Sequence, residues 1–270
     1  RLLIMARPLI RIDDPGDPRI AAYRDIRERD LVGRQGRFVA EGKVVLNVLF
    51  STARFDAESV FLRENRVAGM SALLERIPPH VPVYVADGKV MDSISGFPVH
   101  RGVLAIGLRG AEITAKTLLS SLPENALVVA LCGIADHDNM GAIFRNAAAF
   151  GADAVVMDET SCDPLYRKAI RVSVGAALKV PFSRGGSGET LVQTLQAHGF
   201  HVLALSPTGT YDIRTVERAA RTALLLGAEG PGLPEALIAR STSVHIPMQP
   251  DFDSLNVAAA SAIALHRLWA

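Results

Sequence analysis

The sequence predicts an α/β fold built on a mostly parallel sheet, and three observations support this prediction. Beyond residue 125, short continuous apolar runs alternate with helical patterns. Parallel strands appear as continuous apolar runs, because helices cover both faces of such a sheet. Polar or glycine-rich loops follow several of these runs, at the sheet edge where ligands of parallel sheets bind. With 270 residues, 49% of them apolar, the chain is long enough for two domains.

The balance of charge excludes a protein that coats polyanions. Lysine and arginine number 29 and acidic residues 28, so the net charge is +1. The part before residue 110 carries 17 basic and 13 acidic residues, net +4, and the rest carries 12 and 15, net −3. Any nucleic-acid surface must therefore be local, and the basic first part is where we expect it.

Apolar runs and cysteines indicate the cellular compartment. No apolar run approaches the ~18 residues of a membrane span, and Leu2–Ala6 is shorter than a secretory signal. The two cysteines, Cys132 and Cys162, have neither a CxxC partner nor zinc-site spacing. We therefore expect a cytoplasmic protein.

The first part of the chain reads as a small α/β domain. Helices are expected over Ala21–Leu31 and over Phe38–Phe50, where apolar residues recur every three or four positions. Short strands are expected at Ser59–Leu62 and Val81–Val85. A segment ending in Ser-Ser-Leu-Pro then suits a connector. These features divide the chain into a domain over 1–110, a linker over 111–124 and a second domain over 125–270.

The second domain alternates strands and helices throughout its length. The expected strands are Leu127–Leu131, Ala154–Met157, Lys179–Phe182, Val202–Leu205, Thr222–Leu226 and Ser243–Ile246. The expected helices are Gly141–Phe150, Pro164–Ser173, Thr190–Ala197, Pro234–Ala239 and Leu255–Leu268. This order favours a parallel sheet covered on both faces.

Three loops after these strands carry the candidate chemistry. The loop and helix over 133–151 carry Arg145 one turn beyond Gly141, and small residues at a helix N-terminus accept anions. The loop over 226–234 holds three glycines, which permit close backbone approach to a ligand. The segment over 245–258 passes through two prolines into a Ser-Leu-Asn turn and a small-residue helix.

Each loop also has a plain structural interpretation. The glycine loop lacks the GxGxxG spacing and the Gly-Lys-Ser/Thr ending, which disfavours NAD and ATP. Arg145 is exposed, paired or part of a site, because an unpaired buried guanidinium would be costly. His137 and His245 lack a third ligand at metal-site spacing, so no metal site is predicted. The absence of a Gly-x-Ser-x-Gly elbow counts against an α/β-hydrolase.

In this order the three loops resemble the motifs of the SpoU (TrmH) family of RNA ribose 2′-O-methyltransferases, in the SPOUT superfamily. The first motif is matched by Asn139, Gly141, Ala142 and Arg145. The second is matched by Gly227, Glu229, Gly230 and Gly232, and the third by Ile246, Pro247, Met248, Ser254, Leu255, Asn256 and Val257. The segments Phe38–Phe50 and Ile94–Gly107 resemble the family's small N-terminal RNA-binding domain. The sequence departs from a common family pattern at Ala258 and at 136–138.

The resemblance implies a fold, a cofactor and a set of roles. It implies a C-terminal parallel-sheet SPOUT domain with a trefoil knot, which binds S-adenosylmethionine, plus a small α/β N-terminal RNA-binding domain. The implied cofactor-binding residues are Gly227, Ile246 and Leu255. The implied catalytic residues are Asn139, Arg145, Glu229, Ser254 and Asn256. The implied substrate is a ribose 2′-hydroxyl of rRNA or tRNA.

The resemblance implies that Arg145 activates the hydroxyl. Arginine chemistry favours a bidentate phosphate clamp that lowers the pKa of the hydroxyl, because the guanidinium pKa above about 12 makes a free arginine a poor base. A base with a depressed arginine pKa is the alternative. Asn139 and Asn256 would orient the Arg145 fork and the ribose. Glu229 would fix the glycine loop or meet Asn139. A base-modifying or non-catalytic RNA-binding relative and an enzyme for a small nucleotide remain alternatives.

Two partners are expected. The basic first part would bind RNA through Arg24, Arg27, Arg34 and Arg37, as a stripe along one helix and the loop that follows it. A second copy of the chain would pack on the C-terminal domain to form a homodimer. Small residues over 258–262 permit close helix approach, although burial within one subunit explains them equally well.

Overall fold

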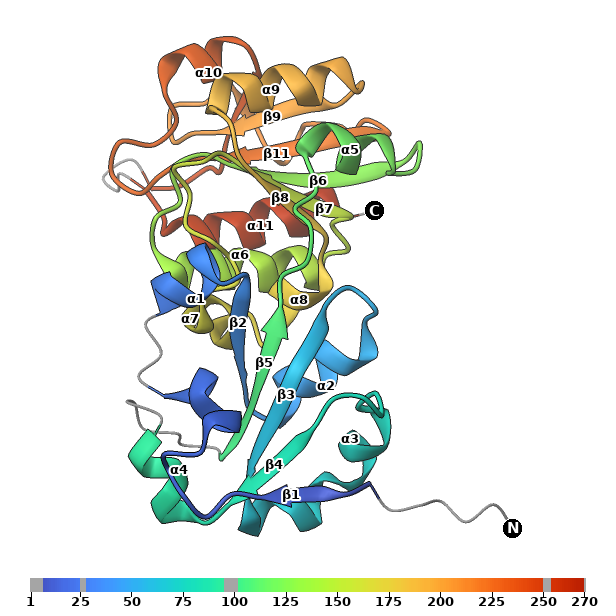
Figure 1. The fold of residues 1–270 in the computed structure, drawn as a ribbon. Helices are drawn as coiled ribbons and strands as arrows, with labels where there is room; N and C mark the ends of the chain where they lie inside the picture. The colour runs from blue at the N-terminus through green and yellow to red at the C-terminus, as the bar shows by residue number, and fades with distance from the viewer. Residues whose placement is uncertain (1–6, 25–27, 95–101, 250–253, 270) are drawn as a thin grey trace. The chain divides into compact units, whose positions relative to one another are not determined.

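The structure is a computed structural model that describes residues 7–24, 28–94, 102–249 and 254–269 (Figure 1). The chain forms two compact units. The first comprises residues 1–111 and 165–179, and the second comprises 112–164 and 180–270. Each unit is built around its own sheet. In the described ranges, no helix is long and apolar enough to cross a membrane.

Five described strands form the mixed sheet of the first unit, in the order β1-β4-β3-β5-β2. Strands β1, β4 and β3 are parallel, and β5 is antiparallel to both β3 and β2. The strands are β1 (Leu9–Arg11), β2 (Arg37–Glu41), β3 (Asp56–Arg63), β4 (Val83–Ala86) and β5 (Val103–Leu108). The helices are η1 (Pro18–Tyr23), α1 (Glu28–Arg34), α2 (Lys43–Ser51), η2 (Glu64–Met70), α3 (Ser71–Arg76), α4 (Gly88–Ile94), α7 (Arg167–Val172) and α8 (Ala176–Lys179).

The core of the first unit explains where one predicted helix fails. Ala21–Leu31 is not one helix: η1 ends at Tyr23, and Arg24 is extended, with φ −91° and ψ 135°. The Tyr23 ring is buried, and its hydroxyl lies 2.8 Å from Ser59 Oγ. Arg24 turns back and donates to the carbonyls of Gly16 and Asp17. These tertiary contacts outweigh the local helical pattern.

The predicted helix Phe38–Phe50 is also wrong in its first part. Residues up to Glu41 form strand β2, which pairs antiparallel with β5, and α2 begins only at Lys43. Phe38 to Ala40 are all buried, so the strand reads as a short apolar run, and periodicity alone does not separate such a run from a helix. Gly42, at φ 98°, makes the turn between strand and helix.

Seven described strands form the sheet of the second unit, in the order β10-β12-β9-β11-β6-β7-β8, and every pairing is parallel. The strands are β6 (Ala126–Leu131), β7 (Ala154–Met157), β8 (Phe182–Arg184), β9 (His201–Leu205), β10 (Tyr211–Asp212), β11 (Arg221–Leu226) and β12 (Thr242–His245). The predicted α/β fold with a parallel sheet is confirmed. The trefoil knot stays a prediction.

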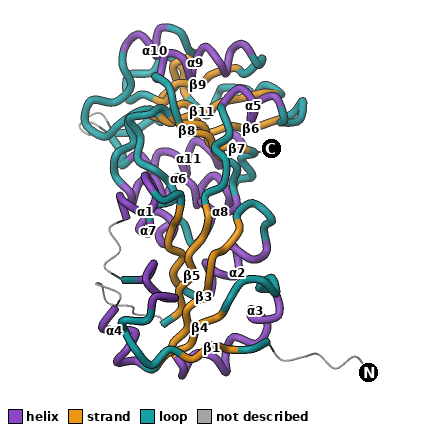
Figure 2. The backbone as a smooth tube through the Cα atoms, in the orientation of Figure 1, coloured by secondary structure: helices purple, strands orange, loops and turns teal. Residues whose placement is uncertain are grey.

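Helices cover both faces of this sheet (Figure 1). One face packs against α5 (Ala115–Ser120), α9 (Gly188–Ala197) and α10 (Glu235–Ala239) around a core that includes Val128, Val156 and Leu225. The other face carries α6 (His137–Ala149) and α11 (Val257–Leu268), which lie side by side (Figure 2).

Two element boundaries in the second unit differ from the prediction. The strand expected at Lys179–Phe182 begins at Phe182: Lys179 ends α8, and Pro181 has no N–H to give to the sheet. Helix α6 begins one turn before Gly141, because Asp136 caps it by accepting from the backbone N–H of Asn139. Gly141 is therefore inside the helix and is not an anion-binding N-terminus.

Candidate active site

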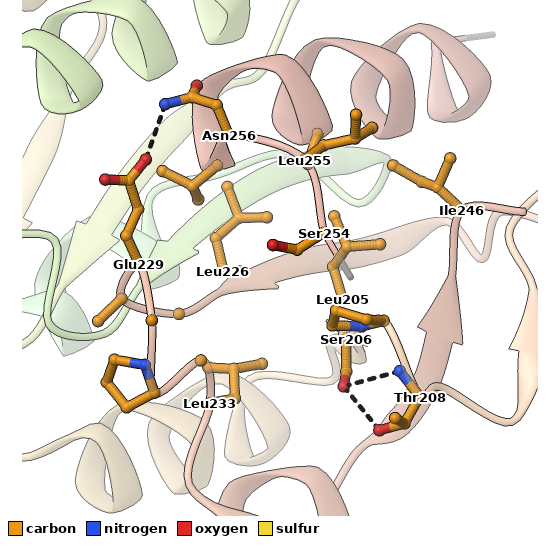
Figure 3. A pocket seen from close by; sticks show the side chains of 18 of the residues that line it. Leu205, Ser206, Thr208, Leu226, Glu229, Leu233, Ile246, Ser254, Leu255 and Asn256 are labelled. Carbon is orange, nitrogen blue, oxygen red and sulfur yellow. Dashed lines mark hydrogen bonds between the residues drawn. The ribbon is translucent and has the colours of Figure 1, made fainter. Parts of the chain in front are cut away.

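A cavity of about 520 Å³ opens in the second unit where β9, β11 and β12 end (Figure 3). Strands β7 and β8 lie to one side of β6, and β11 and β9 lie to the other, so the chain reverses its winding direction at β6. Ligands of open parallel sheets bind at the carboxyl ends of strands beside such a reversal. The sheet topology thus places the cavity where a ligand site is expected.

The lining of the cavity combines apolar walls, a bare backbone and two carboxylates. The apolar side chains belong to Leu205, Leu226, Leu233, Ile246, Met248 and Leu255. The loop after β11 contributes Gly227, Gly230 and Gly232, and the carboxylates are those of Glu229 and Glu235. Such a cavity suits a ligand with a flat apolar part and polar edges that the backbone can reach.

The glycine loop folds back on itself, and this fold requires Gly227. The backbone N–H of Gly232 donates to the carbonyl of Ala228 at 3.0 Å. A Cβ at position 227 would lie 2.6 Å from both Gly232 C and Leu233 N. A side chain at position 227 would therefore distort the loop itself before it entered the cavity.

Three predicted residues from segments far apart in the chain meet in one hydrogen-bonded group, the Asn139–Glu229–Asn256 cluster. Asn139 lies in the first turn of α6, Glu229 in the glycine loop, and Asn256 at the N-cap of α11. Asn256 Nδ2 donates to Glu229 Oε1 at 2.7 Å (Figure 3) and to Asn139 Oδ1 at 2.9 Å. Asn256 Oδ1 accepts from the backbone N–H groups of Ala258 and Ala259, and so caps α11. Glu229 is thus linked to Asn139 through Asn256.

Arg145 lies on α6 and is exposed. It makes no hydrogen bond or ion pair with any residue that the structure describes. Of the three alternatives that the sequence left open, structural pairing is therefore removed. Asn139 and Asn256 bond to each other and leave the Arg145 guanidinium unbound.

The next residue, Asn146, has a role that the sequence analysis missed. Its Nδ2 donates to the Ala258 carbonyl and to Ser261 Oγ, both at 2.9 Å. These bonds fasten α6 to α11, and the buried Ala258 and Ser261 leave room for them. Ala258 and Ser261 thus serve the packing of α6 against α11 within one subunit.

The remaining predicted site residues line the cavity, together with a loop that the prediction omitted. Ser254, Ile246 and Leu255 are wall residues, as are Ser206 and Thr208 in the loop after β9. The signal for this loop was present in the sequence as Ser-Pro-Thr-Gly directly after a predicted strand.

Neither cysteine is suited to nucleophilic chemistry. Burial raises the pKa of Cys132 to about 12 and, together with the charge of Asp163, that of Cys162 to about 12. His245 is bound to the carbonyl oxygen of Gly209 through Nδ1 at 2.8 Å. Among the residues described, no group of three or more His, Cys, Asp or Glu side chains could hold a metal ion.

In the first unit, the predicted arginine stripe along one helix is wrong. Arg24 follows η1, Arg34 ends α1 and Arg37 begins β2, while Arg27 lies outside the described residues. Arg37 binds Glu58 at 2.6 Å and Gln35 at 3.1 Å. The role of these arginines in RNA binding stays a prediction.

Fold and site together define a class, an α/β protein whose cavity is formed by loops at the ends of parallel strands. Comparison with known families specifies it further. The model of the SpoU rRNA Methylase family matches residues 126–266. The chain belongs to this family and is an RNA methyltransferase by that membership.

Relatives and solved structures agree with this assignment. An uncharacterized tRNA/rRNA methyltransferase of Mycobacterium tuberculosis is 39% identical over 262 residues, which are 94% of this chain and 89% of the relative. The 23S rRNA (guanosine-2′-O-)-methyltransferase RlmB of Vibrio vulnificus is 30% identical over 66% of this chain and 73% of its own. The crystal structure of an AdoMet-bound rRNA methyltransferase from Sinorhizobium meliloti covers 96% of this chain and 97% of its own, with a TM-score of 0.78 and 26% identity.

Proposed function

We propose that this protein transfers a methyl group from S-adenosylmethionine (AdoMet) to a ribose 2′-hydroxyl of rRNA or tRNA. One observation carries the proposal: the Asn139–Glu229–Asn256 cluster joins the first turn of α6 to the glycine loop and the start of α11, and its Glu229 and Asn256 line the cavity. The similarity to RlmB, which is named as a guanosine 2′-O-methyltransferase, supports the ribose as acceptor.

The residues of the cavity fit this cofactor. Its volume of about 520 Å³ lies within the usual range for ligand pockets of roughly 300–1,000 Å³. Apolar side chains from Leu205, Ile246 and Leu255 suit an adenine ring, and the backbone of the glycine loop suits its polar edges. The carboxylate of Glu229 offers an attractive charge to a sulfonium cation. When bound, the cofactor would supply an activated methyl group and leave as an uncharged thioether.

The protein's own residues would bind and orient the RNA. The planar Arg145 fork is open to solvent and suits a phosphate in two-point contact. Its charge beside the ribose would also lower the pKa of the 2′-hydroxyl. Asn139 accepts from Asn256 through Oδ1, so its Nδ2 remains as a donor for the ribose. Positioning of this kind supplies much of the acceleration in transfer reactions.

The test has two stages. Titration calorimetry of the full chain with S-adenosylmethionine should show saturable binding. Transfer of labelled methyl groups to bulk rRNA and tRNA, followed by alkaline hydrolysis, should leave the label in alkali-resistant dinucleotides, because a 2′-O-methyl group blocks cleavage. A labelled base would favour the base-modifying alternative. Cofactor binding without methyl transfer would favour the non-catalytic RNA-binding alternative. The absence of cofactor binding would reject the proposal.

Arg145 provides the sharpest variant for this experiment. Arg145→Ala should stop methyl transfer while S-adenosylmethionine binding stays at the wild-type value, because Arg145 is not one of the residues that line the cavity. Arg145→Lys is the matched control, since it keeps the charge and loses the fork. Wild-type transfer by Arg145→Ala would contradict the role given to this residue.

We also propose that the protein is a homodimer through α11 and the end of α6. Ile263 and Trp269 are 45% and 60% exposed, and the Phe150 ring lies 6.5 Å from that of Trp269. An exposed apolar face of this kind is typical of an interface. Light scattering should give twice the chain mass for the wild type and a smaller mass for Ile263→Asp. A fully active wild-type monomer would reject the dimer.

A further inference from the structure

Arg63, at the end of β3, is the centre of a basic surface in the first unit. None of the arginines that the sequence analysis proposed for RNA binding belongs to this surface. Its backbone N–H donates to the carbonyl of Gly102 at 2.8 Å. Two glycines leave the space that its side chain occupies. A Cβ at Gly102 would lie 2.8 Å from Arg63 Cβ, and a Cβ at Gly88 would lie 1.9 Å from Arg63 Nη2.

Two further cations accompany it. Arg66 is exposed, and its Cγ would lie 3.4 Å from a Cβ at Gly102. Lys89 is exposed and follows Gly88 in the chain. Arg63, Arg66 and Lys89 are here called the Arg63 surface.

The acidic groups beside these cations are mostly engaged elsewhere. Glu64 binds Arg11 at 3.0 Å, and Arg11 also binds Asp13 at 2.8 Å. Asp87 accepts from the backbone N–H of Val90. Arg63 has a long contact of 3.5 Å with the exposed Asp92.

No hydrogen bond or ion pair joins Arg66 or Lys89 to the residues that the structure describes. Arg66 and Lys89 are therefore available to an external anion, and Arg63 has a contact of 3.5 Å with the exposed Asp92 that an anion could replace.

The arginines chosen from the sequence differ in this respect. The Arg24 guanidinium is bound to two backbone carbonyls, and that of Arg37 to Glu58. The Arg63 surface lies instead at the carboxyl ends of β3 and β4, the edge of parallel strands where ligands bind.

We propose that the Arg63 surface contacts the phosphate backbone of the RNA substrate. This inference rests on the proposed function, which supplies RNA as the partner. The Arg63 side chain is 35% exposed and lies in the space that the two glycines leave, where its planar fork suits a phosphate in two-point contact. The exposed Arg66 and Lys89, on the segments that follow β3 and β4, add positive charge.

The test measures RNA affinity over a series of salt concentrations. Fluorescein-labelled oligouridylate and bulk tRNA serve as probes, and anisotropy reports binding to the full chain. The double variant Arg63→Ala/Arg66→Ala should raise the dissociation constant about 100-fold, about tenfold for each arginine removed. The salt slope on oligouridylate should become shallower by about 0.7 for each phosphate that the variant no longer neutralises. S-adenosylmethionine affinity should not change.

Two controls separate a direct role in RNA binding from general damage. Arg19→Ala removes an arginine of the same unit that is already bound to Asp17, and should leave RNA affinity within about twofold of the wild type. Gly88→Ala removes no charge, and the three atoms nearest to its methyl group belong to the flexible end of Arg63. The Gly88→Ala variant should fold, and its methyl group should displace the Arg63 guanidinium. Its affinity for RNA should therefore lie between that of the wild type and that of Arg63→Ala. Gly33→Ala, which meets nothing within 4 Å, is its matched control.

The outcomes distinguish this inference from the proposed function. If the wild type methylates RNA and the double variant binds RNA with wild-type affinity and salt slope, the Arg63 surface does not bind the RNA and the inference is overturned. If the wild type neither binds nor methylates RNA, the proposed function fails and the inference fails with it.

Discussion

Asn256 shows how one amide side chain can fix both a helix and a site. Its oxygen faces two backbone N–H groups of α11, so its nitrogen faces the oxygens of Glu229 and Asn139. The amide oxygen and both amide hydrogens are satisfied, and no rotation of the side chain preserves these bonds. The capping role and the clustering role can therefore be separated only by changing the nitrogen alone.

Asn256→Asp makes that change. Aspartate is as good an N-cap as asparagine, so the melting temperature should stay near that of the wild type. Methyl transfer should be lost, because the new carboxylate would repel Glu229 and could not donate to Asn139. Asn256→Ala should lose transfer and also about 1 kcal/mol of stability through the missing cap. Thermal unfolding and transfer assays check both, and an active Asn256→Asp enzyme would contradict the role of the cluster.

Cys132 and Cys162 should react slowly in the folded chain. Their pKa values of about 12, against an ordinary 9.0, leave about 1,000-fold less thiolate at pH 8 than a free thiol has. Because the folded pKa is raised, the thiols favour the folded state below pH 9, and this contribution is lost as the pH rises toward 12. Alkylation by iodoacetamide, with and without urea, checks this, and equal rates would contradict it.

At the scale of elements, the loop between β6 and α6 is held by a buried carboxylate. Asp158 Oδ1 accepts from the backbone N–H groups of Gly133 and Ser161, at 3.1 and 2.9 Å, and from Ser161 Oγ at 2.7 Å. Ser161 Oγ in turn accepts from the N–H of Ile134. This network fixes the start of the segment that carries Asn139 and Arg145.

Asp158→Ala should therefore destabilise the second unit. It leaves two backbone N–H groups without their acceptor, at a cost of about 3 kcal/mol in the free energy of unfolding. Asp158→Asn should cost less, since its amide oxygen can replace Oδ1. Urea unfolding followed by circular dichroism gives both values, and an Asp158→Ala variant as stable as the wild type would show that the network is dispensable.

At the scale of the whole molecule, a short segment of the C-terminal half belongs to the first unit. Residues 165–179, with helices α7 and α8, group with residues 1–111. Arg167 Nη1 on α7 binds Glu41 Oε2 on β2 at 2.9 Å, and the Glu41 side chain is only 3% exposed. The chain thus passes from the second unit into the first and back again.

Removal of one partner of this ion pair should cost more than removal of both. Arg167→Met would leave a buried carboxylate without its cation, at a cost of about 3 kcal/mol in the free energy of unfolding. Addition of Glu41→Gln should recover part of that loss, because the buried charge is then removed. Denaturant unfolding of the two single variants and the double variant gives the coupling energy, and additive effects would show that the pair is not coupled.

The sequence alone determined the parallel α/β fold of the second unit and indicated the candidate residues of its site. Strands such as Ala154–Met157 were predicted within a residue or two, because a buried parallel strand is a continuous apolar run between turn signals. The three motifs were recognisable because each is a contiguous run of chemistry-bearing residues after a strand. The apolar strands and the motifs each depend on neighbouring residues only, so both can be predicted from the sequence.

Only the tertiary structure decided which of these residues meet. Asn139, Glu229 and Asn256 are joined across 27 to 117 positions, and strand order and crossovers bring them together, not periodicity. In the first unit, the contact of Tyr23 with Ser59 and the pairing of β2 with β5 interrupted two predicted helices. Two nearby backbone carbonyls bind Arg24, and Glu58 binds Arg37, two arginines that the sequence had left open for RNA. The local sequence pattern limits which secondary structure a segment can form. Hydrogen-bond partners that are distant in sequence decide which secondary structure forms and which side chains meet in the site.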